Sequence, residues 1–535
     1  MLPLPSLHSL SPSLNGSSLI ARTRSVVRLA VDALNRRELW TKHIDPFITT
    51  ADKLNVEASI LALVCSRVSG SAAELDVDNR ELISTLGPLV RSERNKMLLL
   101  KLPQTSVPIG VAHIALTLAG APDEEFHHFV TEALESGQAD ATERIPYRNM
   151  ELSWLRSLLQ HDSVYQSKCT DILQYTILAT RAHPLYMFPQ DSYAITHELM
   201  YLTNFGASAP PPSLDIGRIA DMLNTNLAWH ALSENLDILG ELLIGATTLR
   251  LPWSPYVKLA WWLLSSAWDE VGVLPGPKFD RSAYDRLTGS ARDDHVFVHS
   301  YHTMFVGGIL CALLSRFPEE GNEPIMATSP IATSQIINRC LAASSLAARF
   351  CGAGKPPSEE TNRATSTPKP DESLGAATTF DEGMLPWRRH RQHERGCPLD
   401  LIAKPLAQCE SFVGPTRFRC RDVVPGSPLD CISLAVVIGD AVLIHAGRRY
   451  DLALLTKTLT EWAMSRLPIS HTFLEATSFL LRQQLPSGAI GAFFVVQDNL
   501  KGREARDVTM CLAYCLASVA KRLISESEQN ERIEG

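Results

Sequence analysis

HPLYMFPQDSYAITHELMYLTNFG, residues 183–206, is the stretch that decides the fold, because it joins a turn to a helix with a polar start. Prolines in its first half interrupt any helix. From Tyr193 to Thr203 the apolar residues follow helical spacing, and Gly206 offers the left-handed position that commonly ends a helix. We expect Asp191 to cap this helix by accepting early backbone N–H groups.

The same order of elements recurs twice further along the chain. A helix ending near Trp268 runs into a Gly- and Pro-containing turn at 272–277, and the next helix opens at His299. The third copy passes through the turn QQLPSGAIG at 483–491 into a helix from about residue 508. Such helix pairs suit an α/α toroid, in which outer and inner helices alternate around a cavity. The third turn resembles those of toroidal terpene cyclases, a resemblance that concerns fold rather than chemistry.

Helical periodicity dominates the remaining chain, including 80–102 and 168–181, and alternation typical of strands is scarce. Residues 434–444 could be read as a strand, but we favour a buried helix there. The sequence therefore predicts an all-α protein with under about 10% strand, against about 20–25% in ordinary domains. The expected parts are a flexible leader (1–24), a helical N-terminal region (25–140), the first part of the toroid (141–351), a disordered insertion (352–397), the last part of the toroid (398–526) and a polar tail (527–535).

Composition narrows the classes of protein without naming a reaction. The 535 residues carry 50 Lys and Arg against 58 Asp and Glu, a net charge of −8 that argues against a nucleic-acid partner. The longest strongly apolar stretches, such as 305–314, are shorter than the ~20 residues of a membrane span. Eleven cysteines without CxxC spacing fit a reducing cytoplasm. Residues 1–31 lack Asp and Glu, so an organelle-targeting segment is the alternative.

The helix after Asp191 carries the first group of candidate site residues. Tyr193, His197 and Tyr201 recur every four residues and share one helix face. We predict that His197 is catalytic and that Tyr193, Tyr201 and Glu198 bind substrate. Packing of these side chains around a semi-polar cavity is the alternative. A zinc-protease helix is excluded, because Tyr201 stands where His-Glu-x-x-His needs its second imidazole.

The second group of candidates opens the helix near residue 299. His299 and His302 are three residues apart, so both imidazoles can face one point, and we predict catalytic roles for them and for Asp294. Tyr301 is a further substrate-binding candidate. A divalent metal held by the imidazoles is an alternative that we do not predict. The cyclase-like acidic cluster at 293–294 lacks its preceding carboxylate, because Ala291 occupies that position.

The string D-x-Y-x-x-T-H-x3-Y-x-T-N-F-G at 191–206 resembles a signature of an uncharacterised family of bacterial helical proteins. Members of that family often accompany natural-product gene clusters and usually have Asp where this chain has Asn204. The resemblance covers roughly residues 147–314, and the C-terminal third more loosely. It implies an all-helical fold and no established activity.

These observations leave two hypotheses for function. Walker-A, GxGxxG and GxSxG motifs are missing from the sequence, which disfavours nucleotide-dependent transferases, Rossmann dehydrogenases and α/β-hydrolases. The first hypothesis is an enzyme of bacterial specialised metabolism that acts on a small molecule by acid–base chemistry, either a lyase or cyclase or a hydrolase. The second is a non-catalytic binding or scaffold protein. If the site is shared, His197 should lie within roughly 12 Å of His299 or His302, since packed helices are ~8–10 Å apart.

Overall fold

The computed structural model describes residues 16–36, 50–68, 72–160, 171–317, 333–350, 431–465, 467–484 and 502–534. Helix accounts for 78% of these residues and none of them forms a strand, which confirms the all-α prediction. The expected insertion at 352–397 and residues 1–15 of the expected leader lie outside the described residues.

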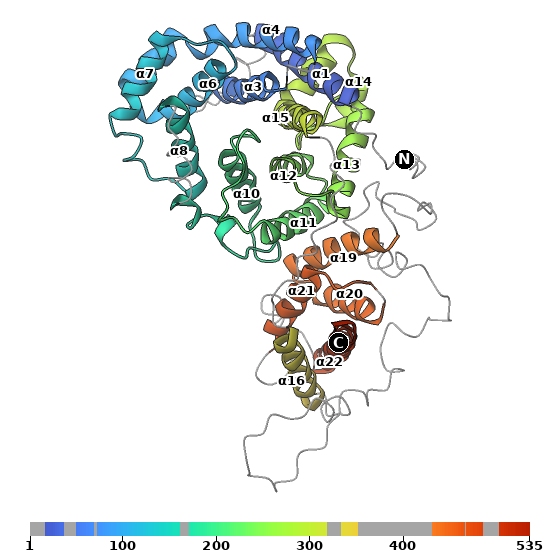
Figure 1. Cartoon of the computed structure of the whole chain (residues 1–535). Coiled ribbons are helices and arrows are strands. Elements are labelled where there is room, and N and C mark those ends of the chain that lie inside the picture. Colours follow the sequence, from blue (N-terminus) through green and yellow to red (C-terminus); the bar gives the residue numbers. More distant parts are fainter. Residues whose placement is uncertain are drawn as a thin grey trace. The chain divides into compact units, whose positions relative to one another are not determined.

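Contacts divide the chain into two compact units, each described here by itself (Figure 1). The N-terminal unit comprises Pro12–Ala182 and Met187–Met326. The C-terminal unit comprises Met1–Ser11, His183–Tyr186 and Ala327–Gly535. The helices of region 25–140 therefore belong to the same unit as those between 141 and 317, and residue 140 is not a boundary between units.

The helices of the N-terminal unit are connected mostly by short turns. In chain order they are α1 Gly16–Asn35, α3 Thr50–Ser66, α4 Ala73–Val90, α5 Glu93–Lys101, η3 Pro103–Thr105, α6 Ser106–Leu118, α7 Glu124–Glu135, α8 Pro146–Gln160, η4 Ile177–Ala179, α10 Pro189–Leu202, α11 Ile216–Leu232, α12 Leu236–Thr248, α13 Pro255–Val271, α14 Arg281–Arg286 and α15 Gly289–Arg316.

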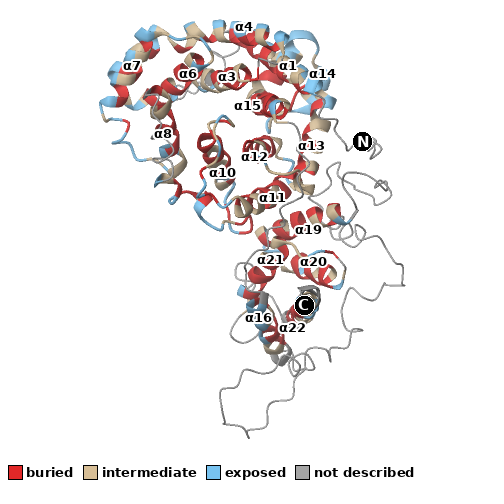
Figure 2. Ribbon diagram, in the orientation of Figure 1, coloured by how far each residue is buried: buried red, intermediate tan, exposed pale blue. Residues whose placement is uncertain are grey.

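Neighbouring helices of this unit form a continuous series. α6 packs on α3, α3 on α15, α15 on α12 and α12 on α10, while α8 contacts both α10 and α6. A second set lies against this series: α1 covers α15, α4 covers α1 and α3, α7 covers α6, and α11 and α13 cover α12 (Figure 1). Figure 2 shows buried residues concentrated on α12 and exposed ones on α7 and α14. Polar side chains on the inner series are thus held among apolar helices.

The longest helix of the N-terminal unit is α15, which extends well beyond the ten-residue apolar stretch seen in the sequence. By length and composition it could cross a membrane, but 78% of its most apolar window is buried inside the protein, as in a core helix. It lies very close to α12, because a Cβ at Gly240 would be 2.6 Å from Cγ1 of Val306. This close approach brings the polar residues of α12 and α15 together.

Local signals explain where several helices begin and end. Ser254 caps α13 by accepting from the Val257 N–H, Pro255 takes the first helical position, and Gly272 ends the helix with φ +86°. Residues 80–102, expected as one helix, form α4 and α5, because Ser92 starts a new helix by accepting from the Asn95 N–H.

Three other local expectations are corrected. Of the helix expected at 168–181, the described residues are helical only at 171–173 and in the short η4 helix, with turns at 174–176 and 180–181. Helix α10 begins at Pro189, so Asp191 lies inside its first turn, where Oδ2 accepts from the Phe188 N–H at 2.7 Å instead of capping the following residues. Gly206 has the expected left-handed conformation, with φ +78°, but it does not end the helix, because α10 stops at Leu202 and Thr203 is its C-cap.

The C-terminal unit contains α16 Thr333–Phe350, α19 Cys431–Arg448, α20 Leu452–Met464, α21 His471–Arg482 and α22 Gly502–Glu534. Residues 434–444 belong to α19, which confirms the helix prediction there. α16 packs on α22, and Ser344 Oγ donates to the Ala513 carbonyl at 2.8 Å across this contact. The tail expected at 527–535 is helical up to residue 534, while the turn at 483–491 lies mostly outside the described residues.

Candidate functional site

Two buried carboxylates lie on one face of a helix that is otherwise apolar. Asp237 and Glu241 of α12 are four residues apart, which places both side chains on the same face. Asn235 fixes the start of this helix, because its Oδ1 accepts from the Ile238 N–H at 3.3 Å. Side-chain exposure is only 5% for Asp237 and 2% for Glu241. A buried carboxylate requires polar partners, and those partners come from other helices.

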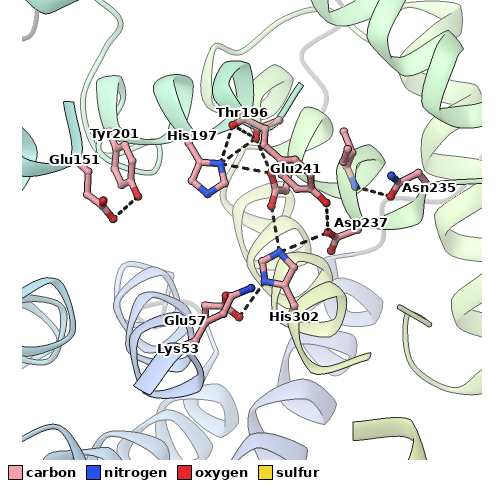
Figure 3. Close-up of polar contacts among 12 residues, drawn as sticks. Lys53, Glu57, Glu151, Thr196, His197, Tyr201, Asn235, Asp237, Glu241 and His302 are labelled. Carbon is pink, nitrogen blue, oxygen red and sulfur yellow. Dashed lines mark hydrogen bonds and ion pairs between the residues drawn. The ribbon is translucent and has the colours of Figure 1, made fainter. Parts of the chain in front are cut away.

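His302 of α15 is the partner shared by three carboxylates (Figure 3). Its Nε2 lies 3.3 Å from Glu241 Oε1 and 3.6 Å from Asp237 Oδ2. Its Nδ1 lies 2.9 Å from Oε2 of Glu57, which comes from α3. A single imidazole therefore connects α3, α12 and α15, and we call Glu57, Asp237, Glu241 and His302 the buried cluster.

Hydroxyl groups contact both oxygens of Asp237 and the second oxygen of Glu241. Thr196 Oγ1 donates to Glu241 Oε2 at 2.5 Å. Thr303 Oγ1 donates to Asp237 Oδ1 at 2.9 Å, and the Tyr193 hydroxyl donates to Asp237 Oδ2 at 3.2 Å. Both carboxylates are thus held in one orientation by side chains of α10 and α15.

His197 of α10 lies beside the buried cluster and is 25% exposed. Its Nδ1 is 2.8 Å from the Tyr193 carbonyl oxygen, so this nitrogen carries the proton and donates. The same atom lies 3.8 Å from Glu241 Oε2. In the neutral ring Nε2 then has a lone pair, and no described residue hydrogen-bonds to it. Such a nitrogen can accept a proton from a bound molecule.

Charge interactions within the buried cluster shift its pKa values in opposite directions. Burial by itself lowers the pKa of His302, but Glu57, Glu241 and Asp237 outweigh it and raise that pKa well above its ordinary value. Burial also raises the pKa of Asp237; His302 opposes this effect and Glu241 adds to it. Burial by itself raises the pKa of Glu241 as well, yet His197, His302 and Thr196 bring it below its ordinary value. Glu241 is therefore the carboxylate most strongly favoured as an anion.

The sequence-predicted residues His197, His302 and Tyr193 are brought together. Both imidazoles contact the carboxylate of Glu241, as the expectation of a shared site requires. Tyr301 is also nearby: burial raises its pKa, and the carboxylates of Glu57 and Asp237 raise it further.

Tyr201 also packs near His197, with ring centroids 6.2 Å apart. Its hydroxyl is directed to α8, where it donates to Glu151 Oε1 at 2.8 Å. Arg148 pairs with the other oxygen of Glu151 at 2.9 Å. Tyr201 thus belongs to a separate polar group on the α8 side of α10.

Three other predicted site residues contact different groups. Asp294 forms an ion pair with Arg36, which follows α1. The ring of His299 packs on His295 with centroids 4.6 Å apart. Glu198 is buried and accepts from the Leu178 N–H at 3.3 Å, so it faces η4. The predicted catalytic roles of His299 and Asp294 stay predictions, and the described contacts are those of Asp294 with Arg36 and of His299 with His295.

Sequence reasoning missed Glu57, Asp237 and Glu241. The signal for the last two was present: LDILGELLIGATT, residues 236–248, is apolar apart from small residues and two carboxylates one turn apart. A helix that is apolar on all sides is buried, so its carboxylates must serve a partner. Glu57 gave no comparable signal. Three donor atoms, one each from Asp237, Glu241 and His302, lie within 4.8 Å of one another, a separation compatible with a shared ion.

Comparison with known proteins identifies a family for this chain, but the function of that family is unknown. A family model described as a domain of unknown function (DUF6895) matches residues 24–312, which include every residue of the buried cluster. No curated protein and no solved structure matches the chain.

Proposed function

The chain belongs to the family described as a domain of unknown function (DUF6895), and from this premise we propose that it is an enzyme that changes a small molecule by acid–base chemistry. One observation carries the proposal: two imidazoles from different helices, His197 and His302, contact the same buried carboxylate, Glu241. An imidazole oriented by a carboxylate is a common arrangement for moving protons in enzymes.

The burial of these groups supports a functional role. Charged groups lose several kcal/mol of solvation when buried, and well-packed apolar residues would often stabilise the same position better. Sites with strongly shifted pKa values and convergent polar groups are therefore candidates for catalysis. Asp237 and Glu241 are buried in the N-terminal unit, and Glu57 contacts His302 beside them.

His197 is the residue that we assign to the reacting proton. Its Nδ1 is occupied by the Tyr193 carbonyl, and its Nε2 carries the available lone pair. Glu241, 3.8 Å from Nδ1, stabilises the imidazolium that forms when Nε2 takes a proton. Proton transfer of this kind serves a lyase or cyclase, and equally a hydrolase that activates water.

The proposal also includes a fold, the α/α toroid, and a biological setting, bacterial specialised metabolism, and each has its own support. A toroid of different extent from the predicted one is supported by the closed series of neighbours α6, α3, α15, α12, α10 and α8, with other helices packed against it. This series includes α3 and α6 from the region 25–140, whereas the helices of 398–526, expected as the last part of the toroid, belong to the other unit. The assignment to bacterial specialised metabolism is supported by the sequence signature at 191–206.

The test is to incubate the purified chain with a small-molecule extract of the organism that encodes it and to follow the mixture by mass spectrometry. We expect one compound to be consumed and one or two to appear; an unchanged mass indicates a cyclase or isomerase, loss of a small fragment indicates a lyase, and two products whose masses add up to that of the substrate plus water indicate a hydrolase. His197→Ala should slow this conversion at least about 100-fold, the usual contribution of a general acid–base group. Its melting temperature should change little, because the ring is partly exposed.

The matched control is His128→Ala, which removes an exposed imidazole on α7 and should leave the conversion unchanged. If the wild-type chain retains a compound without altering it, the protein is a binding or scaffold protein and the enzymatic proposal is wrong.

A further inference from the structure

We infer that Asp237, Glu241 and His302 bind one divalent transition-metal ion, of the class of Mn²⁺ or Zn²⁺. The inference rests on the proposed function in that it names the ion of the same site. Three atoms provide the ligands: Asp237 Oδ2, Glu241 Oε1 and His302 Nε2. They come from two helices and lie within 4.8 Å of one another.

The distances between these atoms fit the edges of a coordination shell. His302 Nε2 lies 3.3 Å from Glu241 Oε1 and 3.6 Å from Asp237 Oδ2. An ion about 2.1 Å from each ligand separates neighbouring ligands by about 3.0 Å in an octahedron and about 3.4 Å in a tetrahedron. Small rotations of the side chains would therefore suffice to place all three around one ion.

The second atom of each ligand side chain is already held by a neighbour. Glu57 Oε2 lies 2.9 Å from His302 Nδ1 in an ion-pair contact, so a metal would bind at Nε2 in place of the proton that this nitrogen carries in the imidazolium. Thr196 donates to Glu241 Oε2, and Thr303 donates to Asp237 Oδ1. Metal-binding imidazoles and carboxylates are characteristically oriented in this way by outer hydrogen bonds.

The charges of the buried cluster also favour a cation. Three carboxylates meet one imidazole, so negative charge remains in excess even when His302 is protonated, and Lys53, 3.4 Å from Glu57, is 54% exposed. A divalent ion between Asp237 and Glu241 would neutralise both carboxylates directly.

The ligand set indicates the class of ion. Imidazole nitrogen suits first-row transition metals, whereas Ca²⁺ and Mg²⁺ prefer oxygen. Three protein ligands leave at least one coordination position for water or for a substrate oxygen, as in catalytic metal sites.

The experiment measures metal binding alone, so that it is independent of turnover. Tag-free full-length chain is freed of metal by chelation and dialysis and then titrated with MnCl₂ and ZnCl₂ separately, by calorimetry and, for Mn²⁺, by electron paramagnetic resonance. We expect one ion per chain for at least one metal. Asp237→Asn, Glu241→Gln and His302→Ala should each weaken binding at least about 100-fold. Glu57→Gln should weaken it about 10-fold, within the range for outer hydrogen-bond partners.

The matched control is Glu198→Gln, a buried carboxylate of α10 that faces η4 and should leave the affinity unchanged. Because Asp237→Asn and Glu241→Gln keep the side-chain shape, circular dichroism can show that loss of binding is not loss of fold. The bound metal should also raise the melting temperature of the wild type and not of these two variants. Absence of stoichiometric binding to the wild type, or equal affinity in the variants, overturns the inference. That result would leave the small-molecule conversion assay unaffected, so the two proposals fail separately.

Discussion

Glu57 on α3 places its Oε2 2.9 Å from Nδ1 of His302 on α15. This contact joins the beginning of the N-terminal unit to its longest helix, inside a region where neighbouring side chains are mostly apolar. Because the other imidazole nitrogen faces Asp237 and Glu241, Glu57 controls the orientation of the ring toward both.

The first prediction follows from this contact. Glu57→Gln should lower the free energy of unfolding by about 1–3 kcal/mol, because it removes a charge-assisted interaction from a partly buried imidazole. Urea denaturation monitored by circular dichroism measures the change. Lys53→Gln removes the more exposed partner of Glu57 and should change stability by less than about 1 kcal/mol. Equal effects of the two variants would show that the contact of Glu57 with His302 contributes no more to the free energy of unfolding than its contact with Lys53.

The second prediction concerns the hydroxyl that holds Asp237. Thr303→Val keeps the shape of a buried side chain and removes the donor to Asp237 Oδ1, so it should cost about 1–3 kcal/mol. The comparison is Thr85→Val on α4, whose hydroxyl bonds only to the Glu81 carbonyl of its own helix. That change should stay within about 0.5 kcal/mol. If Thr303→Val leaves the stability unchanged, Asp237 Oδ1 has another hydrogen-bond donor in solution.

Helices were predictable where the chain carries its own boundary signals. The helix expected to end near Trp268 is α13, because Ser254, Pro255 and Gly272 mark its ends locally. The segment 168–181 misled the prediction, because distant residues determine its path: Arg218 donates to the Leu178 and Thr180 carbonyls, and Glu198 accepts from the Leu178 N–H. Periodicity contains no information about such contacts.

The site was predictable only in part for the same reason. His197 and His302 stood out as imidazoles expected near helix starts. The helix expected to open at His299 in fact begins at Gly289, so His302 lies in the interior of α15. Asp294 and His299 were chosen for their proximity to His302 in sequence, whereas the partners of His302 come from α3 and α12. Convergence of residues from separate helices depends on packing angles and close approaches such as that at Gly240, which a single sequence does not reveal.

The third prediction tests this close approach between α12 and α15. Gly240→Ala should destabilise the protein by about 1–3 kcal/mol, because its Cβ would lie 2.6 Å from Cγ1 of Val306 and force the helices apart. The rate of substrate conversion and the affinity for metal should both fall as well, since Asp237 and Glu241 would move away from His302. Adding Val306→Ala removes the clashing methyl groups, so the double variant should be more stable than the sum of the single changes predicts. Strict additivity would contradict the proposed contact.

The last prediction concerns the pH dependence of stability and uses Glu198, which lies on α10 away from the buried cluster. Burial raises the pKa of its carboxyl to about 7 from an ordinary 4.5, although the Leu178 N–H, the Thr176 hydroxyl and the Ile177 N–H oppose the shift. Between these two values the folded chain holds a proton that the unfolded chain releases. The free energy of unfolding should therefore fall as the pH rises from about 4.5 to 7, by up to about 3 kcal/mol from this group. Glu198→Gln is neutral at every pH and keeps an oxygen for the Leu178 N–H. Its stability relative to the wild type should increase with pH across this window and level off above it, as measured by urea denaturation at several pH values. A stability difference that is constant from pH 5 to 8 would show that Glu198 ionises in the folded chain much as it does in the unfolded one.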